Sequence, residues 1–259
     1  MNYVEELFSL KGQVAVVIGG GGVLAGAMAD GLAKAGADVA ILDLSPANAQ
    51  AAAARIKATG AAAIAVATDA TSKKDLLDAE AIVARELGEA TILINAPGIN
   101  SSTPFFEIGE EEYDKIMKVN LKSMFLSCQV FGKKMVANAK GGSIINVSSA
   151  SSGPPLSKVF TYSLSKASVN NLTQFLAREW AEQGVRVNAI APGFFPAEQN
   201  RKILTPERVA DIMKHTPMNR FGEAEELIGA TIWLASAKAS SFVTGAIVRV
   251  DGGFTAMTI

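Results

Sequence analysis

Tyr162 and Lys166 are the residues of this sequence whose types and spacing most directly indicate chemistry. They stand at positions i and i+4, so on a helix their side chains lie on one face, close together. A lysine ammonium beside a phenol favours the phenolate, and we therefore expect Lys166 to lower the pKa of Tyr162. A phenol that titrates nearer to neutral pH can donate and accept protons in catalysis. A Ser-Ser-Ala sequence that contains Ser149 precedes the pair.

A run of glycines near the N-terminus indicates a nucleotide-binding loop. Residues 19–22 are all glycine, and they follow an expected strand at 14–18 and precede an expected helix at 28–34. Such a loop presents backbone N–H groups at a helix N-terminus, where a pyrophosphate binds. The pattern Gly20-x-Gly22-x-x-Ala25 also fits the dinucleotide-binding fingerprint.

Asp43 ends a second expected strand, at 39–43, and lies 21 residues after Gly22. A carboxylate about 20 residues beyond the glycine loop is expected to hold the adenosine ribose. This carboxylate can accept hydrogen bonds from both ribose hydroxyls of NAD, whereas it would repel the extra phosphate of NADP. Leu44 follows it, and the next basic residue is Arg55. The sequence therefore predicts NAD as the cofactor.

The composition is that of a globular protein with a large core. The chain has 259 residues, of which 49% are hydrophobic and 19% charged, with a net charge of -1. We see no linker, repeat or charge block, so we expect one domain over residues 1–259. Basic residues are scattered, which argues against a nucleic-acid partner. No apolar run reaches the ~18 residues of a membrane helix, and no secretory signal is visible, so we expect a cytoplasmic protein.

Two residues that occur once limit the possible chemistry. Cys128 lies in an apolar helical stretch, so we expect a buried, unreactive thiol and no internal disulfide. His215 is the one histidine, which precludes a multi-histidine metal site, and we expect it in a loop or on the surface. We therefore predict no bound metal.

Strands and helices are expected to alternate along the chain. Further strands are expected at 63–67, 91–95, 142–148, 185–190 and 246–250, and helices after residue 48 and at 113–136, 163–182 and 227–237. This alternation predicts an α/β fold, a single-domain doubly wound parallel sheet with helices on both faces. The glycine loop, Asp43, Asn95, Ser149 and Pro192 all follow expected strands, so they should converge in one crevice at the carboxyl ends.

Several ordered motifs together resemble the short-chain dehydrogenase/reductase family over nearly the whole chain. The matching residues are the glycine loop, Asp43, Asp69, Asn95 to Gly98, Asn120, Ser149, Tyr162, Lys166, Pro192-Gly193 and Asp251-Gly-Gly253. The resemblance implies a Rossmann-fold enzyme that interconverts a ketone and a secondary alcohol with NAD(H).

The resemblance also implies a role for each of four residues. Tyr162 would be the acid/base, and Ser149 would hydrogen-bond the substrate carbonyl oxygen. Lys166 would hold the nicotinamide ribose, and Asn120 would support a water that links Lys166 to solvent. Ser148 is the nearest rival for the serine role, but the 13-residue spacing to Tyr162 favours Ser149.

Cofactor contacts are implied at many positions. They are Gly19, Gly20, Gly21, Gly22, Val23, Leu24, Asp43, Asp69, Ala70, Asn95, Ala96, Pro97, Tyr162, Lys166, Pro192, Gly193 and Phe195. The chain departs from the family pattern at Ile18, Val23 and Ala25 in the glycine loop, at Ala96, and at Ala197, where a threonine often stands. We expect these departures to alter cofactor affinity rather than the chemistry.

The substrate is expected to be a keto sugar acid such as fructuronate. Residues 192–202 and 215–221 resemble the sugar-acid branch of the family, which includes fructuronate reductases (D-mannonate oxidoreductases). Lys158 and Arg201, with Lys202, are candidate partners for the substrate carboxylate. The alternative is that they are solvated surface charges.

Two other functions remain open. The first is reduction of 3-oxoacyl thioesters or other apolar ketones, in a pocket lined by Phe105, Phe106, Phe194, Phe195 and Met218. The second is a non-catalytic binding protein with a Rossmann fold. The family resemblance and the apolar tail at 254–259 also lead us to expect a homo-oligomer, specifically a homotetramer, because chain ends are usually polar and mobile unless they are tied down.

Overall fold

The computed structural model describes residues 2–138, 140–154, 156–196 and 205–257. These residues form one sheet of seven parallel strands in the order β3-β2-β1-β4-β5-β6-β7. The strands are β1 (Val14–Ile18), β2 (Asp38–Asp43), β3 (Ala63–Ala67), β4 (Ile92–Asn95), β5 (Gly142–Val147), β6 (Val185–Pro192) and β7 (Ile247–Val250). The strand order reverses between β1 and β4, which makes this a doubly wound sheet and confirms the predicted fold class.

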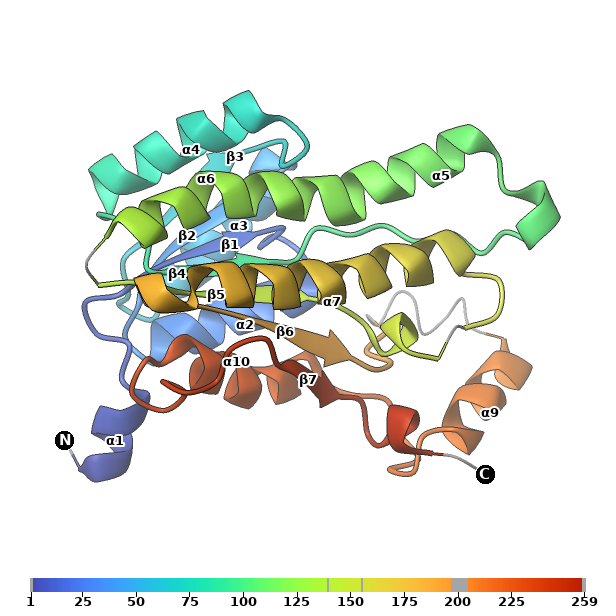
Figure 1. The fold of residues 1–259 in the computed structure, drawn as a ribbon. Helices are drawn as coiled ribbons and strands as arrows, with labels where there is room; N and C mark the ends of the chain where they lie inside the picture. Colours follow the sequence, from blue (N-terminus) through green and yellow to red (C-terminus); the bar gives the residue numbers. More distant parts are fainter. Residues whose placement is uncertain (1, 139, 155, 197–204, 258–259) are drawn as a thin grey trace.

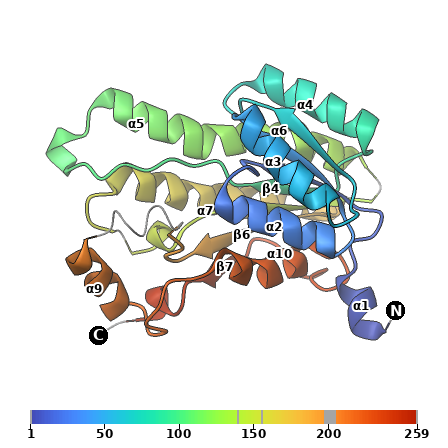
Figure 2. The ribbon, with the colours of Figure 1, turned by 180° about the vertical axis from the view of Figure 1, so that it is seen from behind.

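Helices cover both faces of the sheet. The helices of the described residues are α1 (Tyr3–Phe8), α2 (Val23–Lys34), α3 (Pro46–Lys57), α4 (Lys73–Glu86), α5 (Glu110–Met117), α6 (Ser123–Ala137), α7 (Phe160–Trp180), α9 (Pro206–Lys214) and α10 (Ile228–Ala235). Figure 1 looks onto the face covered by α4, α6 and α7, and Figure 2 shows α2, α3 and α10 on the opposite face. The sheet is therefore the middle layer of three, with an apolar core on each side.

Strands β1 and β6 are buried along their whole length because both of their faces are covered. Every residue of β1 (Val14–Ile18) is buried, as is every residue of β6 (Val185–Pro192). The continuous hydrophobic run of β1 is typical of a parallel strand between two helical layers, whereas β6 also buries Arg186 and Asn188. The edge strand β7 is less enclosed, and none of its four residues is fully buried.

The helices that position the candidate site begin at defined residues. Helix α2 begins at Val23, directly after the glycine run, and Gly22 occupies its N-cap without a side-chain hydrogen bond. The backbone N–H groups of its first turn are therefore available for an anion. Helix α7 begins at Phe160, three residues earlier than expected, and so it carries both Tyr162 and Lys166.

The long helix expected at 113–136 is interrupted. Between α5 and α6 the chain forms a π-helical segment at Lys118–Lys122, and the buried Asn120 lies inside it. Single π-helical turns within α-helices often occur at functional sites. Across the described residues, no helix combines the length and the apolar character that crossing a membrane requires.

Candidate active site

A cavity of about 600 Å³ opens at the carboxyl ends of the central strands. It is lined by residues from the glycine loop, the ends of β4, β5 and β6, the start of α7, and α9. Of the predicted site residues it gathers Gly19, Gly22, Val23, Leu24, Ala96, Ser149, Tyr162, Lys166, Pro192, Gly193 and Phe195. The expected crevice therefore forms where strand topology places it.

Tyr162 and Lys166 lie together in this cavity, as their spacing predicts. The Lys166 ammonium is 5.7 Å from the centroid of the Tyr162 ring. It donates a hydrogen bond of 2.8 Å to the carbonyl oxygen of Val147, and the lysine is only 3% exposed. The lysine is thus anchored to the end of β5 while its charge faces the phenol.

Burial controls the ionisation of both groups. Desolvation raises the pKa of Tyr162 above its ordinary value, although a hydrogen bond with Ser149 acts in the opposite direction. Desolvation lowers the pKa of Lys166 from 10.5 to about 8. The pKa of Tyr162 is therefore raised and not lowered as expected, because burial of the phenol outweighs its hydrogen bond with Ser149.

Ser149, and not Ser148, faces the tyrosine. The Ser149 hydroxyl oxygen accepts hydrogen bonds from the backbone N–H of Ser151 at 3.2 Å and from its hydroxyl at 3.0 Å. Its own proton is then free to be donated to Tyr162 or to a substrate oxygen. Ser148 instead donates to the Asn170 side chain at 2.6 Å, away from the tyrosine. The geometry therefore favours Ser149 for the serine role.

Asn120 holds the backbone next to the cavity. Its side-chain oxygen accepts from the N–H of Ile99 at 2.8 Å, and its amide donates to the Ile99 carbonyl at 2.9 Å. The same amide donates to the Ser165 hydroxyl at 3.0 Å. Asn120 thus ties the segment after β4 to helix α7 and fixes one wall of the cavity.

The glycine loop is shaped for close approach. Gly19 has a φ of +74°, and a Cβ there would lie 3.2 Å from the backbone of Ala96. A Cβ on Gly21 would lie 2.8 Å from a carboxylate oxygen of Asp43. That carboxylate accepts the N–H of Gly21 at 3.0 Å and the N–H of Ser45 at 2.9 Å. Asp43 therefore supports the loop and still has lone pairs for ribose hydroxyls.

A dinucleotide fits the residues present. The glycine loop leaves space that a Cβ would fill, and the first turn of α2 has free backbone N–H groups, so together they suit a pyrophosphate. The carboxylate of Asp43 suits a ribose. Gly20 and Gly21 lie in the loop itself, although they do not line the cavity. Asp69 accepts hydrogen bonds from Thr71 just after β3, and neither it nor Ala70 or Pro97 lines the cavity.

The Asn95 side chain points away from the cavity. It is fully buried, donates to the Asn146 side chain at 2.9 Å, and accepts from the Ser127 hydroxyl at 2.6 Å. Cys128 lies beside it, and burial raises the pKa of this thiol to about 12. The Asn95 side chain thus joins a polar network in the core while Ala96 lines the cavity, and the expected cofactor contact of Asn95 stays a prediction.

Of the predicted carboxylate partners, Lys158 lies within the described residues. Lys158 is exposed, has a φ of 65°, and does not line the cavity. Arg201, Lys202 and Ala197 lie outside the described residues. A cation that sequence reasoning missed does line the cavity, namely Arg208 in the first turn of α9. The sequence feature that could have indicated Arg208 is a basic residue in the first turn of the first described helix after β6.

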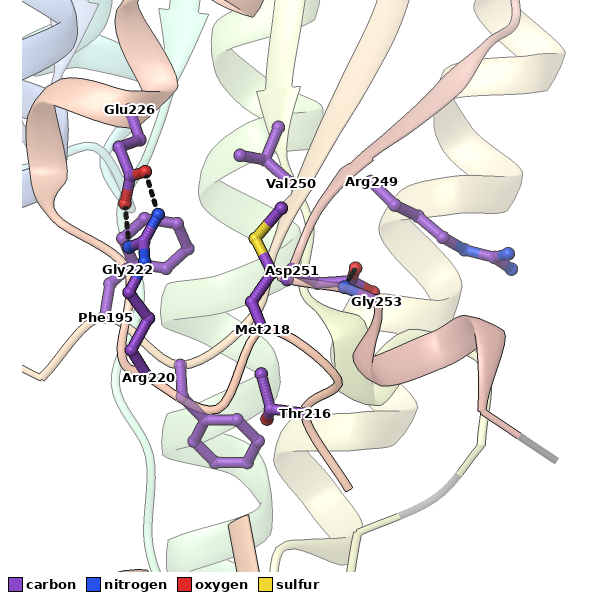
Figure 3. A pocket seen from close by; sticks show the side chains of 12 residues that line it. Phe195, Thr216, Met218, Arg220, Gly222, Glu226, Arg249, Val250, Asp251 and Gly253 are labelled. Carbon is purple, nitrogen blue, oxygen red and sulfur yellow. Dashed lines mark hydrogen bonds and ion pairs between the residues drawn. The ribbon is translucent and has the colours of Figure 1, made fainter. Parts of the chain in front are cut away.

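A second cavity, of about 370 Å³, lies beyond Phe194 and Phe195, which line both cavities. Arg220 and Glu226 form a bidentate pair there, with distances of 2.8 and 2.6 Å, as Figure 3 shows. This cavity contains Met218 but neither Ser149 nor Tyr162 and Lys166, so the candidate chemistry belongs to the larger cavity.

The chain is similar to known proteins in sequence and fold. Residues 22–255 match the family model described as Enoyl-(Acyl carrier protein) reductase. The uncharacterized oxidoreductase UxuB of Bacillus subtilis (strain 168) is 40% identical over 269 residues, which cover 96% of each chain.

Two solved structures are also similar over their whole length. One, a candidate D-mannonate oxidoreductase from Haemophilus influenza with bound NAD, is 33% identical with a TM-score of 0.93, and the match covers 98% of this chain and 99% of that chain. The other, a gluconate 5-dehydrogenase from Burkholderia cenocepacia J2315 in complex with NADP and tartrate, is 32% identical with a TM-score of 0.93, covering 99% and 100%. This chain is an oxidoreductase that belongs to the short-chain dehydrogenase/reductase family.

Proposed function

We propose that the protein interconverts a ketone and a secondary alcohol of a sugar acid, such as fructuronate and mannonate, with NAD(H). The observation that carries the proposal is the meeting of Ser149, Tyr162 and Lys166 in one cavity beside the glycine loop. The similar D-mannonate and gluconate oxidoreductases support a sugar acid as the substrate.

The residues of the cavity can handle the oxygen and the proton of this reaction. When bound, the nicotinamide would supply the hydride to the carbonyl carbon or accept it in the reverse direction. The Ser149 hydroxyl would donate a hydrogen bond to the carbonyl oxygen, where negative charge develops. Tyr162 would give its proton to that oxygen, and the Lys166 ammonium would stabilise the phenolate that remains.

We also propose a preference for NAD over NADP, set by Asp43. Its carboxylate lies against the glycine loop, and the exposed Leu44 follows it. Arg55 is the first cation after this strand, and it is paired with Asp30 at 2.8 Å. Arg55, the cation that could have neutralised a 2′-phosphate, is therefore already neutralised by Asp30.

The Asp43→Asn variant tests this preference, because it removes the charge and keeps an oxygen that can accept from the loop. We expect the ratio of kcat/KM for NADH over NADPH to fall by about 10- to 150-fold, the equivalent of a charged hydrogen bond of about 1.5–3 kcal/mol. A wild-type enzyme that uses NADPH better than NADH would contradict the proposal.

A substrate panel followed by NADH absorbance tests the reaction itself. It contains fructuronate, 5-ketogluconate, the neutral keto sugar fructose and a 3-oxoacyl thioester. We expect the acids to be reduced with the highest kcat/KM. Activity on the thioester alone would favour the apolar alternative, which the structure supports poorly because Phe105 and Phe106 are 62% and 99% exposed and lie outside the cavity. Binding of NADH without turnover of any substrate would favour the non-catalytic alternative.

A further inference from the structure

The cavity has a one-sided charge. Among the described residues that line it, the charged side chains are Lys166 and Arg208, and none is acidic. Lys166 is buried at the cofactor side and already donates to the Val147 carbonyl. Arg208 is half-buried, and its guanidinium makes no hydrogen bond or ion pair with any residue that the structure describes. Among the residues that the structure describes, none neutralises this guanidinium, which can therefore bind an anion.

Helix α9 directs Arg208 toward the protein rather than toward solvent. Arg208 stands four residues before Ile212, which is 3% exposed and anchors the helix, so the two share one face. Its neighbours Glu207 and Asp211 lie on the exposed face. The helix is fixed at its start by Thr205, whose hydroxyl oxygen accepts the N–H of Arg208 at 3.2 Å. The inward side of α9 thus holds the arginine at the cavity.

Arg220 gives a comparison within the same chain. Its guanidinium is satisfied by Glu226 in a bidentate pair (Figure 3), and it lines only the smaller cavity. A planar guanidinium recognises a carboxylate through two parallel hydrogen bonds. Arg208 has the same planar guanidinium, and no carboxylate of the described residues forms an ion pair or hydrogen bond with it.

We propose that Arg208 binds the carboxylate of the substrate and determines the preference for sugar acids over neutral sugars. This inference rests on the proposed function, and it replaces the earlier expectation for Lys158, which is exposed and outside the cavity. The reacting carbonyl would lie at Ser149 and Tyr162, and the acid end of the molecule would lie toward α9. Specificity would then come from a residue remote from the catalytic centre in sequence.

The test compares fructuronate with fructose, and each with NADH, in wild type and in Arg208→Met, Arg208→Lys and Lys158→Met. Lys214→Met is the matched control, since Lys214 is an exposed cation on the same helix. In Arg208→Met we expect kcat/KM for the acid to fall about 10- to 150-fold, mainly through KM. Activity on fructose and the KM for NADH should be unchanged, which also shows that the variant is folded. Arg208→Lys should recover part of the lost kcat/KM for the acid. Lys158→Met and Lys214→Met should both match wild type.

Three results would overturn the inference. If Arg208→Met kept the wild-type preference for the acid, Arg208 would have no such role while the proposed function stood. If its KM for NADH rose instead, Arg208 would belong to the cofactor site. If Lys158→Met lost the preference, the carboxylate would bind there. A wild-type enzyme without activity on any sugar acid would overturn the proposed function itself, before any variant is compared.

Discussion

At the scale of single residues, desolvation decides how Tyr162 and Lys166 ionise. The spacing of these two residues correctly predicts that they are neighbours, because the helical repeat is a local property. It does not predict that burial raises the pKa of the phenol and lowers that of the ammonium to about 8. Burial depends on segments far away in the sequence, such as the end of β5 at Val147, which the spacing of two residues cannot reveal.

Replacement of the phenol hydroxyl should remove the proton donor. We expect Tyr162→Phe to lower kcat by about 10²–10⁴-fold, the usual contribution of general acid/base catalysis. Helix α7 and the glycine loop should persist, so NADH should bind with nearly unchanged affinity, as measured by its fluorescence. A variant that retains more than half of the wild-type kcat would exclude Tyr162 as the acid/base.

The lowered pKa of Lys166 has a consequence for stability. Between pH 8 and 10.5 the unfolded state keeps the lysine proton that the folded state has lost, so the unfolding free energy rises with pH. We expect wild type to gain up to about 3 kcal/mol relative to Lys166→Met over this interval, at about 1.36 kcal/mol per pKa unit. Urea unfolding at several pH values measures the difference. A constant difference across the interval would mean that the lysine titrates normally.

At the scale of elements, the π-helical segment places Asn120 where a regular helix would not. The sequence 113–136 predicts one continuous helix, and helical periodicity alone contains no sign of the extra residue in the turn. In the structure, Asn120 lies in the π-helical segment and makes three hydrogen bonds, two with the backbone of Ile99 and one with the Ser165 hydroxyl. A local irregularity thus connects two segments that line or support the cavity.

Loss of the hydrogen bonds of Asn120 should lower the free energy of unfolding. Asn120→Leu would remove the hydrogen bonds of Asn120 to the part-buried N–H and carbonyl of Ile99, each worth about 0.5–1.5 kcal/mol. We expect a lower free energy of unfolding in urea, together with a lower kcat. Gln129→Leu is the control, because Gln129 is an exposed amide on the adjoining helix α6, and it should change stability by less than about 0.5 kcal/mol. Equal stability of the two variants would contradict the connecting role.

At the scale of the whole molecule, the alternation of strands and helices is sufficient to predict the sheet and its crevice. Parallel strands place their carboxyl ends on one side, so Ser149 and the glycine loop meet although about half of the chain separates them. Arg208 could not be predicted in the same way. Arg208 lies on helix α9, so its position at the cavity depends on how that helix packs and not on the end of a strand.

Two exposed apolar regions lie outside the crevice. The first is a groove on α5, α6 and α7, which Phe125 lines with 44% of its surface exposed; Phe175, on α7, is 56% exposed. The second comprises the open edge strand β7 and Phe242, which precedes the strand by five residues and is fully exposed. Apolar patches and open sheet edges of this kind are typical of surfaces between subunits. The tail contributes less than expected, because Phe254 packs against Phe194 of its own chain at 5.2 Å.

We therefore propose a homotetramer built from two different two-fold interfaces, one through the groove of α5, α6 and α7 and one through the region around β7. Light scattering at micromolar concentration should give about four times the 27.0 kDa of one chain. Phe125→Glu would bury a charge at the first interface only, so it should leave a dimer held by the second. Val4→Glu, at an exposed position on α1, should remain tetrameric. A wild-type mass near that of a single chain would exclude both interfaces, and a tetrameric Phe125→Glu would exclude the groove.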